Sequence, residues 1–390
     1  MPGRKQLLWL LTCSIALISA SQPVPAQGPP APASPGPATP GDAAFAQGRF
    51  EQAEAAYAGA IASNPALAGA LAGLARKALA ASPGQPVATG VMAIADQRRR
   101  AFGPERYQIT GPTAPATVPF VITDPLPVVK LRVGDREANF MIDTGAPDIM
   151  IKQSLADALG LKVTAAGEGV FAGGRRAPVQ QTVVPELEIG GIRIRNVPAG
   201  VRPAQGGIAL PGVEIDGIIG TGLLMHFLST LDYCGGRLVL APRRDSAAFE
   251  KRAASGQANI VPMWLVGDHF IFARGRLGQA PEAMFHIDTG LAGGGLTANK
   301  ASLDAAGIMV DESQARTGMG GGGPVRIIPF RADATLGTLS RSNVVGIYSP
   351  DGDPMSIFPF RVGGQLSHGF FRQSRLTFDF DAMRLVTESC

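Results

Sequence analysis

The sequence has little charge and few of the residues that bind metals. Of its 390 residues 17% are charged, and the formal net charge is +4. No cluster of Lys and Arg is interleaved with aromatic residues, which disfavours nucleic acid as a partner. The four His and three Cys do not have the spacing of a zinc site, so no metal or organic cofactor is implied. The motifs H-E-x-x-H and G-x-S-x-G are absent, which disfavours zinc and serine hydrolases.

Glycine and proline, by contrast, are abundant. The chain has 50 Gly and 32 Pro, and 45% of its residues are hydrophobic. Such a composition favours many turns and short strands over long helices, with enough apolar residues to bury a core. The length is sufficient for two or three domains.

The first 26 residues are typical of a secretory signal peptide. Arg4 and Lys5 precede an apolar centre at 7–18, and small residues follow it. Because the apolar run is short for a membrane span, we expect an exported protein, periplasmic or extracellular, with no integral membrane span after signal removal. An uncleaved N-terminal anchor and a lipoprotein anchor at Cys13 are the alternatives.

Signal removal would leave two cysteines, Cys234 and Cys390. Export permits disulfides, so these two can pair and tie one half of the chain to its C-terminus. Two unpaired thiols are the alternative, because a sequence does not give the distance between the two Cα atoms.

Two segments separate the signal peptide from the rest of the chain. Residues 27–41 are rich in Pro and Ala, which predicts an extended linker. Residues 42–105 have a helical pattern whose small and aromatic residues are spaced as in the second helix of a tetratricopeptide repeat. The positions that carry this similarity are Gly48, Phe50, Ala53, Tyr57, Ala60 and Pro65. A plain helical hairpin is the alternative.

A six-residue stretch occurs twice in the remainder. At 140–145 and again at 285–290, an apolar run leads into Asp-Thr-Gly. Other stretches recur at a constant offset of 147: Leu231-Asp232 and Phe378-Asp379, Arg237-Leu238-Val239 and Arg384-Leu385-Val386, Ile189-Gly190 and Leu336-Gly337, Asn196-Val197 and Asn343-Val344. This pattern predicts a tandem duplication of an all-β unit, with one lobe at 115–248 and the other at 256–390.

Paired aspartates are suited to the hydrolysis of amides by water. Two carboxylates about 3 Å apart cannot both ionise readily, so they share one proton, and the pair can act as acid and base. Glycine lets the backbone approach closely, and threonine offers a hydroxyl that can brace one half against the other. The apolar strand before each Asp would hold it on a rigid element.

The two halves resemble aspartic proteases of the retropepsin type, fused in tandem as in pepsin-like enzymes. The resemblance covers residues 115–390 and is carried by both Asp-Thr-Gly stretches, by Ala146 and by Ile218-Ile219-Gly220. It implies a mainly all-β, bilobal fold of two duplicated β-barrel-like lobes, preceded by a small helical region. It also implies a monomeric aspartic endopeptidase that acts on peptides or proteins.

The resemblance assigns a role to each matching residue. Asp143 and Asp288 would be the catalytic dyad, Thr144 and Thr289 would exchange hydroxyl contacts, and Gly145 and Gly290 would supply the close backbone. Residues Ile218, Ile219 and Gly220 would cradle the first catalytic loop. The Gly-rich segments at 167–174 and 318–323, with Phe171, Gly173, Gly318 and Gly320, would be flaps over the substrate, or else plain loops.

The second half departs from the family pattern. Gln365, Leu366 and Ser367 stand where an apolar-apolar-Gly turn is expected. The histidine two residues before Asp288, His286, is interpreted as a partly exposed strand residue and not as a cation beside the dyad. A module that binds peptides or proteins in the same cleft without cleaving them is therefore the alternative function.

Overall fold

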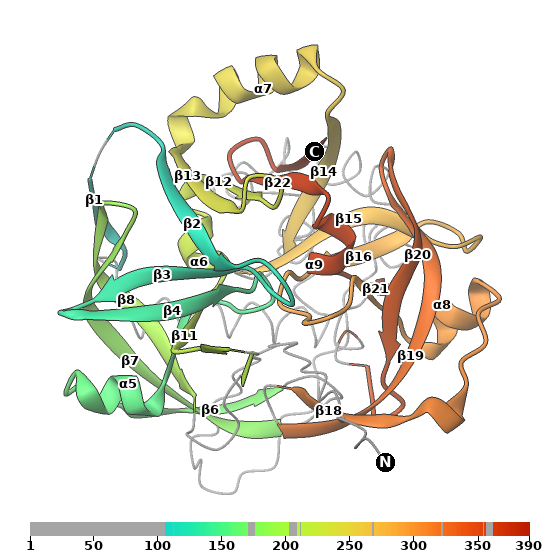
Figure 1. Ribbon diagram of the computed structural model, residues 1–390, viewed down its shortest axis with the longest axis horizontal. Helices are drawn as coiled ribbons and strands as arrows, with labels where there is room; N and C mark the ends of the chain where they lie inside the picture. Colours follow the sequence, from blue (N-terminus) through green and yellow to red (C-terminus); the bar gives the residue numbers. More distant parts are fainter. Residues whose placement is uncertain are drawn as a thin grey trace, which may run out of the picture.

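The computed structural model describes residues 106–390, except for 112, 171–175, 203–208, 211, 267–268, 321–322, 354 and 356–361. The predicted signal peptide, linker and tetratricopeptide-like segment lie outside the described residues. The described part consists of two similar lobes of short β-strands that meet along a shared sheet (Figure 1). The mainly-β, bilobal fold predicted from the sequence is confirmed.

The first lobe is a closed barrel. Its strands are β1 (Gln108–Thr110), β3 (Val128–Val133), β4 (Arg136–Ile142), β5 (Ile149–Lys152), β6 (Thr164–Val170), β7 (Arg176–Ile189), β8 (Ile192–Arg202) and β11 (Gly217–Ile219), with β9 (Ala209–Leu210) and β10 (Val213–Glu214) as a separate pair and α5 (Gln153–Ala158) and α6 (Thr221–Leu224) as its helices. The barrel closes because β8 pairs with β7 on one side and, in parallel, with β5 on the other.

The second lobe repeats this plan. Its elements are β15 (Phe270–Leu277), β16 (Ala283–Ile287), β17 (Leu296–Thr297), α8 (Lys300–Ala305), η4 (Glu312–Gln314), β18 (Arg316–Gly320), β19 (Gly323–Leu336), β20 (Leu339–Tyr348), β21 (Val362–Leu366) and α9 (His368–Phe371). Here β20 pairs with β19 and, in parallel, with β17. The two barrels therefore close through equivalent strands.

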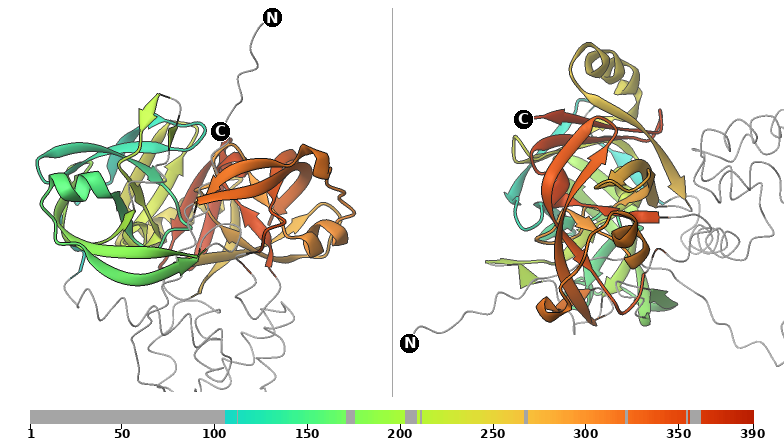
Figure 2. Two further views of the ribbon diagram at one scale, coloured as in Figure 1. Left: turned by 90° about the horizontal axis from the view of Figure 1, so that it is seen from below. Right: turned by 90° about the vertical axis from the view of Figure 1, so that its right-hand side faces the viewer.

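A six-stranded sheet joins the lobes. Its order is β2 (Ala116–Ile122), β13 (Arg237–Pro242), β12 (Phe227–Asp232), β22 (Ser374–Asp379), β23 (Arg384–Ser389) and β14 (Asn259–Val266). At its centre Thr230 lies opposite Thr377, and their hydroxyls are 2.8 Å apart. Because these residues are 147 positions apart, the pseudo-twofold axis of the duplication passes between them. Figure 2 shows the lobes side by side about this boundary.

The duplication extends to unusual backbone conformations. Asn196 and Asn343 both have positive φ, at 54° and 57°, and Gly190 and Gly337 both have a φ of 58°. Each pair is separated by the offset of 147 found in the sequence. A positive φ is uncommon for residues other than glycine, so its recurrence at matched positions within β8 and β20 supports one ancestral unit copied twice.

One helix in the shared region was not predicted. The short η3 (Arg243–Asp245) and then α7 (Ser246–Ser255) lie across the predicted end of the first lobe at 248 and the predicted start of the second at 256. Phe249 and Ala253, four residues apart, face the same side of α7 and pack on Leu228 and Val386 of the shared sheet. Figure 1 shows this helix across the end of that sheet.

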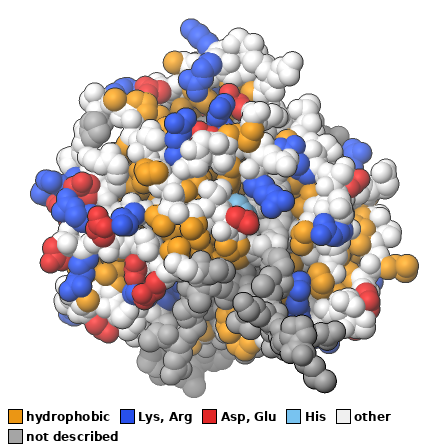
Figure 3. Space-filling model, viewed as in Figure 1, with side chains coloured by type: hydrophobic (Ala, Val, Ile, Leu, Met, Phe, Trp, Pro, Cys, Tyr) orange, Lys and Arg blue, Asp and Glu red, His pale blue; other side chains and the backbone are white. Residues whose placement is uncertain are grey.

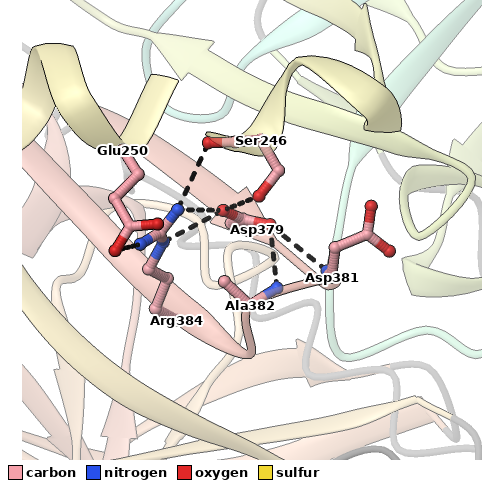
Figure 4. Close-up of polar contacts among 6 residues, drawn as sticks. All are labelled: Ser246, Glu250, Asp379, Asp381, Ala382 and Arg384. Carbon is pink, nitrogen blue, oxygen red and sulfur yellow. Dashed lines mark hydrogen bonds and ion pairs between the residues drawn. The ribbon is translucent and has the colours of Figure 1, made fainter. Parts of the chain in front are cut away.

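An ion-pair network fixes α7 to the second lobe (Figure 4). Asp379 accepts hydrogen bonds from Arg384 at 2.8 and 3.0 Å and from the Ser246 hydroxyl at 2.7 Å. Arg384 also pairs with Glu250 of α7 at 2.8 Å. Since Asp379 and Arg384 are both buried, the many hydrogen bonds offset the cost of removing their charges from water.

Cys234 and Cys390 form a disulfide, with their Cα atoms 5.3 Å apart. It connects the turn between β12 and β13 to the C-terminus, which lies where the lobes meet (Figure 2). Basic and acidic side chains are interspersed on the face of the molecule shown in Figure 3. Within the described residues, no helix has the length and apolar character needed to span a membrane.

Candidate active site

The two repeated aspartates lie at matching places, directly after β4 and β16. The Asp143 N–H donates to the Ile219 carbonyl and the Asp288 N–H donates to the Leu366 carbonyl, each at 3.0 Å. Both acceptors lie on a strand that runs parallel to the aspartate's own strand. Both side chains are fully buried. The second lobe therefore keeps the same backbone support for its aspartate, despite its altered sequence at 365–367.

Two threonines connect the loops across the lobe boundary. The Thr144 N–H donates to the Thr289 hydroxyl, and the Thr289 N–H donates to the Thr144 hydroxyl, both at 3.1 Å. The hydroxyls in turn donate to carbonyls of the opposite lobe, that of Thr144 to Ile287 at 2.7 Å and that of Thr289 to Ile142 at 3.1 Å. These four reciprocal bonds hold the two aspartate-bearing strands in a fixed relation.

Two glycines bring each carboxylate against the opposite loop. A methyl group added to Gly145 would lie 2.6 Å from Oδ2 of Asp288, and one added to Gly290 would collide with the carboxylate of Asp143. Each glycine N–H also donates to Oδ1 of the aspartate of its own loop, at 2.9 Å in both lobes. Only glycine fits at these two positions, because any side chain would occupy the space of a carboxylate.

The two carboxylates are electrostatically coupled. Burial raises the pKa of Asp143 well above its ordinary value, and the charge of Asp288 and a side-chain hydrogen bond with it raise that pKa further. The Gly145 N–H and the positive charge of Arg202 act in the opposite direction. Arg202 stays cationic, because burial lowers its pKa only to about 10. The pair therefore retains a proton at pH values where an exposed aspartate would already have lost it.

The Asp-Thr-Gly loop of the first lobe rests on the turn after β11. Residues 218–220 are buried, and a side chain at Gly220 would collide with the Ala146 carbonyl. Thr221 then begins α6, and its hydroxyl donates to the Thr144 carbonyl at 2.8 Å. The predicted cradle residues thus lie directly behind the Asp-Thr-Gly loop.

The second loop rests on a different set of bonds. The hydroxyl of Ser367 accepts a hydrogen bond from the Leu291 N–H at 3.0 Å. The backbone of this turn also donates to the glycine-rich loop, from Ser367 to Gly295 at 2.9 Å and from Gly369 to Gly294 at 3.0 Å. The glycines after Gly290 are thus held by backbone hydrogen bonds.

The predicted flap segments fall in two hairpins. β6 pairs with β7, and β18 pairs with β19. Figures 1 and 2 show the two hairpins at the same edge of the molecule, approaching each other at the lobe boundary. Gly318 and Gly320 lie in β18, and both are buried. Phe171 and Gly173 lie outside the described residues.

Two cavities flank the Asp-Thr-Gly loop of the second lobe. One, of about 390 Å³, reaches Gln365 and has an apolar wall. Its apolar side chains include Val325, Ile327, Ile347 and Met355. The other, of about 520 Å³, lies between the glycines at 293–295 and three arginines, Arg331, Arg341 and Arg372. Among the described residues, no three His, Cys, Asp or Glu side chains gather as a metal site would require.

The prediction that His286 is partly exposed is wrong. Its side chain is fully buried between Phe270 and Phe272, with ring centroids 5.5 and 5.4 Å away. Burial lowers the pKa of His286 to about 4, so its ring is neutral and not a cation beside the dyad. Met141 occupies the equivalent place in the first lobe and is likewise fully buried.

Two polar residues of the site were given no role from the sequence. Arg202, at the end of β8, supplies positive charge near Asp143. Gln365 donates a hydrogen bond to Oδ2 of Asp288 at 3.0 Å. The sequence contains a signal for Gln365, because the offset of 147 aligns it with the apolar Ile218. It contains no such signal for Arg202, whose proximity depends on the closure of the barrel.

The threonine contacts predict a specific loss of stability. Thr289→Val removes the acceptor of the Thr144 N–H and the donor to Ile142, and leaves both of those groups buried and unpaired. We expect the free energy of unfolding to fall by about 2–3 kcal/mol, measured by urea denaturation. Thr377→Val is the matched control, since it removes an interlobe hydroxyl pair without orphaning backbone groups. An equal loss in both variants would contradict a special role for the Thr144 and Thr289 pair.

Comparison with known families supports an aspartic protease. The family model described as aspartyl protease matches residues 129–223. This stretch begins in β3, ends in α6 and includes Asp143 with its supporting turn at 218–220. A search of curated proteins finds no match. The match and the duplicated β fold together support peptidase activity for a chain that is similar to aspartyl proteases over its first lobe.

Proposed function

We propose that the chain is an exported aspartic-type endopeptidase whose catalytic dyad is Asp143 and Asp288. The observation that carries this proposal is the pair of buried carboxylates, one from each lobe, each packed against the glycine of the opposite loop. The raised pKa of Asp143 supports it, because a pair that retains one proton can act as acid and base together.

The proposed reaction adds water across a peptide bond. The ionised carboxylate takes a proton from water as the water oxygen bonds to the carbonyl carbon. The protonated carboxyl donates its proton to the carbonyl oxygen, which gives a tetrahedral intermediate with two hydroxyls. The C–N bond then breaks as the nitrogen takes a proton from one carboxyl of the dyad and a hydroxyl of the intermediate returns its proton to the other carboxylate. The products are a carboxylic acid and an amine, and the dyad again holds one proton.

An extended peptide is the substrate that the site fits. The hairpins of β6 with β7 and of β18 with β19 offer strand edges along which peptide backbone can bond. The apolar cavity beside Gln365 would accept a hydrophobic side chain close to Asp288. One chain supplies both aspartates, so a monomer is sufficient for activity.

Export is the proposed setting. The predicted signal at 1–26 would direct the chain out of the cytoplasm, and the disulfide between Cys234 and Cys390 is suited to an oxidising compartment. The periplasm or the cell exterior meets both requirements. Sequencing the mature N-terminus tests this, since a chain that retains its apolar start would be anchored instead.

The decisive experiment is digestion of an unfolded protein by the purified mature chain at mildly acidic pH. New internal peptide termini, identified by mass spectrometry, are the expected result. Their absence in both Asp143→Asn and Asp288→Asn would assign the activity to the dyad. Binding of the unfolded protein without cleavage by the wild type would overturn the proposal and favour a peptide-binding module.

The shared proton predicts an acidic pH profile. Because the folded-state pKa of Asp143 is raised, the proton is present below that pKa and is lost as pH rises through it. We expect kcat/KM to fall on the alkaline side for this reason. It should also fall in strong acid, where both carboxyls become protonated. A rate that keeps increasing into the alkaline range would contradict a mechanism that needs the shared proton.

A further inference from the structure

The two carboxylates of the dyad do not have the same neighbours. The strand β11 presents Ile218 beside the β4 strand of Asp143, in register with Met141. The equivalent strand β21 presents Gln365 beside β16, in register with His286. Gln365 is buried, with 3% of its surface exposed. The otherwise symmetrical site thus has an amide on one side and an aliphatic side chain on the other.

The amide of Gln365 is held in one orientation. Its Nε2 donates to Oδ2 of Asp288 at 3.0 Å and lies 3.1 Å from Nδ1 of His286. Its Oε1 accepts a hydrogen bond from the hydroxyl of Thr297 at 2.9 Å. A flipped amide would place its oxygen between Oδ2 of Asp288 and Nδ1 of His286 and would leave no N–H for either of them. Both N–H groups and the oxygen of the amide therefore have a hydrogen-bond partner.

Neutral His286 is required for this arrangement. Nδ1 can accept from Gln365 only in the neutral tautomer that carries its proton on Nε2. Burial among aromatic rings keeps the imidazole uncharged above its lowered pKa of about 4. The nearby His269 lowers that pKa further, while Asp288 acts in the opposite direction. The histidine thus fixes the amide without adding a positive charge to the site.

We propose that Gln365 is a positioning residue that keeps Asp288 ionised and so places the shared proton of the dyad on Asp143. A hydrogen bond donated to a carboxylate favours its charged form, and lobe 1 offers Asp143 only the apolar Ile218 at the same position. The roles then follow: Asp288 is the base that activates water, and Asp143 is the acid that protonates the carbonyl oxygen. This assignment of roles rests on the proposed peptidase function, whereas the placement of the proton does not.

The other charged groups that face the dyad leave this asymmetry in place. Arg202 favours ionised Asp143, but its influence is smaller than those of burial and of Asp288. His269 and His286 lie on the Asp288 side, and His286 carries no charge at working pH. The direct hydrogen bond from Gln365 to Asp288 has no counterpart at the apolar Ile218, and so it distinguishes the two carboxylates.

The test is a titration of the dyad that requires no activity. Carboxyl-¹³C aspartate is incorporated into the chain, and the dyad signals are assigned with Asp143→Asn and Asp288→Asn. In Gln365→Met, which keeps the length of the side chain, we expect the lower macroscopic pKa of the dyad to rise by roughly one unit. The acid limb of kcat/KM should move upward by the same amount, with KM little changed.

Two further variants keep the proposal falsifiable. Thr297→Val leaves Gln365 in place but removes the hydroxyl that orients it, so a smaller shift in the same direction is expected. Thr377→Val is the stability control and should leave the dyad pKa unchanged. A lower pKa that is the same in wild type, Gln365→Met and Thr297→Val would overturn the proposal. If the wild type does not cleave peptides but Gln365→Met still shifts the dyad pKa, only the proposed peptidase function is overturned.

Discussion

Replacing Asp143 by asparagine is expected to lower kcat/KM for peptide cleavage by roughly 10³-fold or more. The amide keeps the shape of the carboxyl, and its oxygen can still accept from the Gly145 N–H. It cannot, however, hold and donate the proton that the dyad shares. Because the interaction is made with the reacting atoms, the loss should fall on kcat, with KM nearly unchanged.

The same variant should not be less stable at neutral pH. The folded-state pKa of Asp143 is raised, so its contribution to stability is present at low pH and is lost as pH rises through that pKa. The neutral asparagine amide carries no such penalty, and we expect the free energy of unfolding to increase at pH 7. Asp135→Asn, at an exposed turn of the same lobe, controls for the loss of one negative charge. Activity close to wild type in Asp143→Asn would dismiss the dyad.

The fold could be predicted because the sequence contains an internal duplication. The offset of 147 and the repeated Asp-Thr-Gly identify two similar units, and alternating apolar residues identify their strands. Helix α7 was missed because it belongs to neither copy. Its buried apolar face consists of Phe249 and Ala253 alone. This short stripe is buried because it packs against the shared sheet, which the sequence does not show.

The site was only half predictable for a different reason. Motif positions such as Asp288 and Gly290 are fixed by local backbone geometry, which the sequence repeats. The contacts of Gln365 are made with His286 and Thr297, which belong to two other segments. The sequence shows that an apolar position has become polar, but only the pairing of β21 with β16 and β17 shows what the amide contacts.

The contacts that break the symmetry between the lobes lie in the second lobe. The contacts on the axis are symmetrical, as in the Thr230 and Thr377 pair. Away from it, Arg237 is half-exposed where it pairs with the buried Asp232 at 2.8 Å, while in the equivalent pair both Arg384 and Asp379 are buried under α7. Gln365 follows the same pattern. The duplication supplies two carboxylates, and substitutions in the second copy make them inequivalent.

Removing the disulfide is expected to cost about 3–5 kcal/mol of unfolding free energy. Cys234 and Cys390 are 156 positions apart, so the bond closes a loop that contains the whole second lobe. Without the bond, this long stretch of the unfolded chain gains conformational entropy, while the folded lobes keep their shared sheet. The measurement is urea denaturation of the Cys234→Ser, Cys390→Ser double variant, beside reduced wild-type protein.

The slope of the urea transition separates this mechanism from a loss of native contacts. An unfolded chain without the cross-link exposes more surface, so the m-value should rise together with the fall in stability. Reduced wild type should match the double variant in both quantities. Activity at 25 °C should be retained, because the bond joins the turn between β12 and β13 to the C-terminus, at strand ends of the shared sheet and away from both Asp-Thr-Gly loops in the sequence. A loss below about 1 kcal/mol with an unchanged m-value would show that the bond does not constrain the unfolded chain.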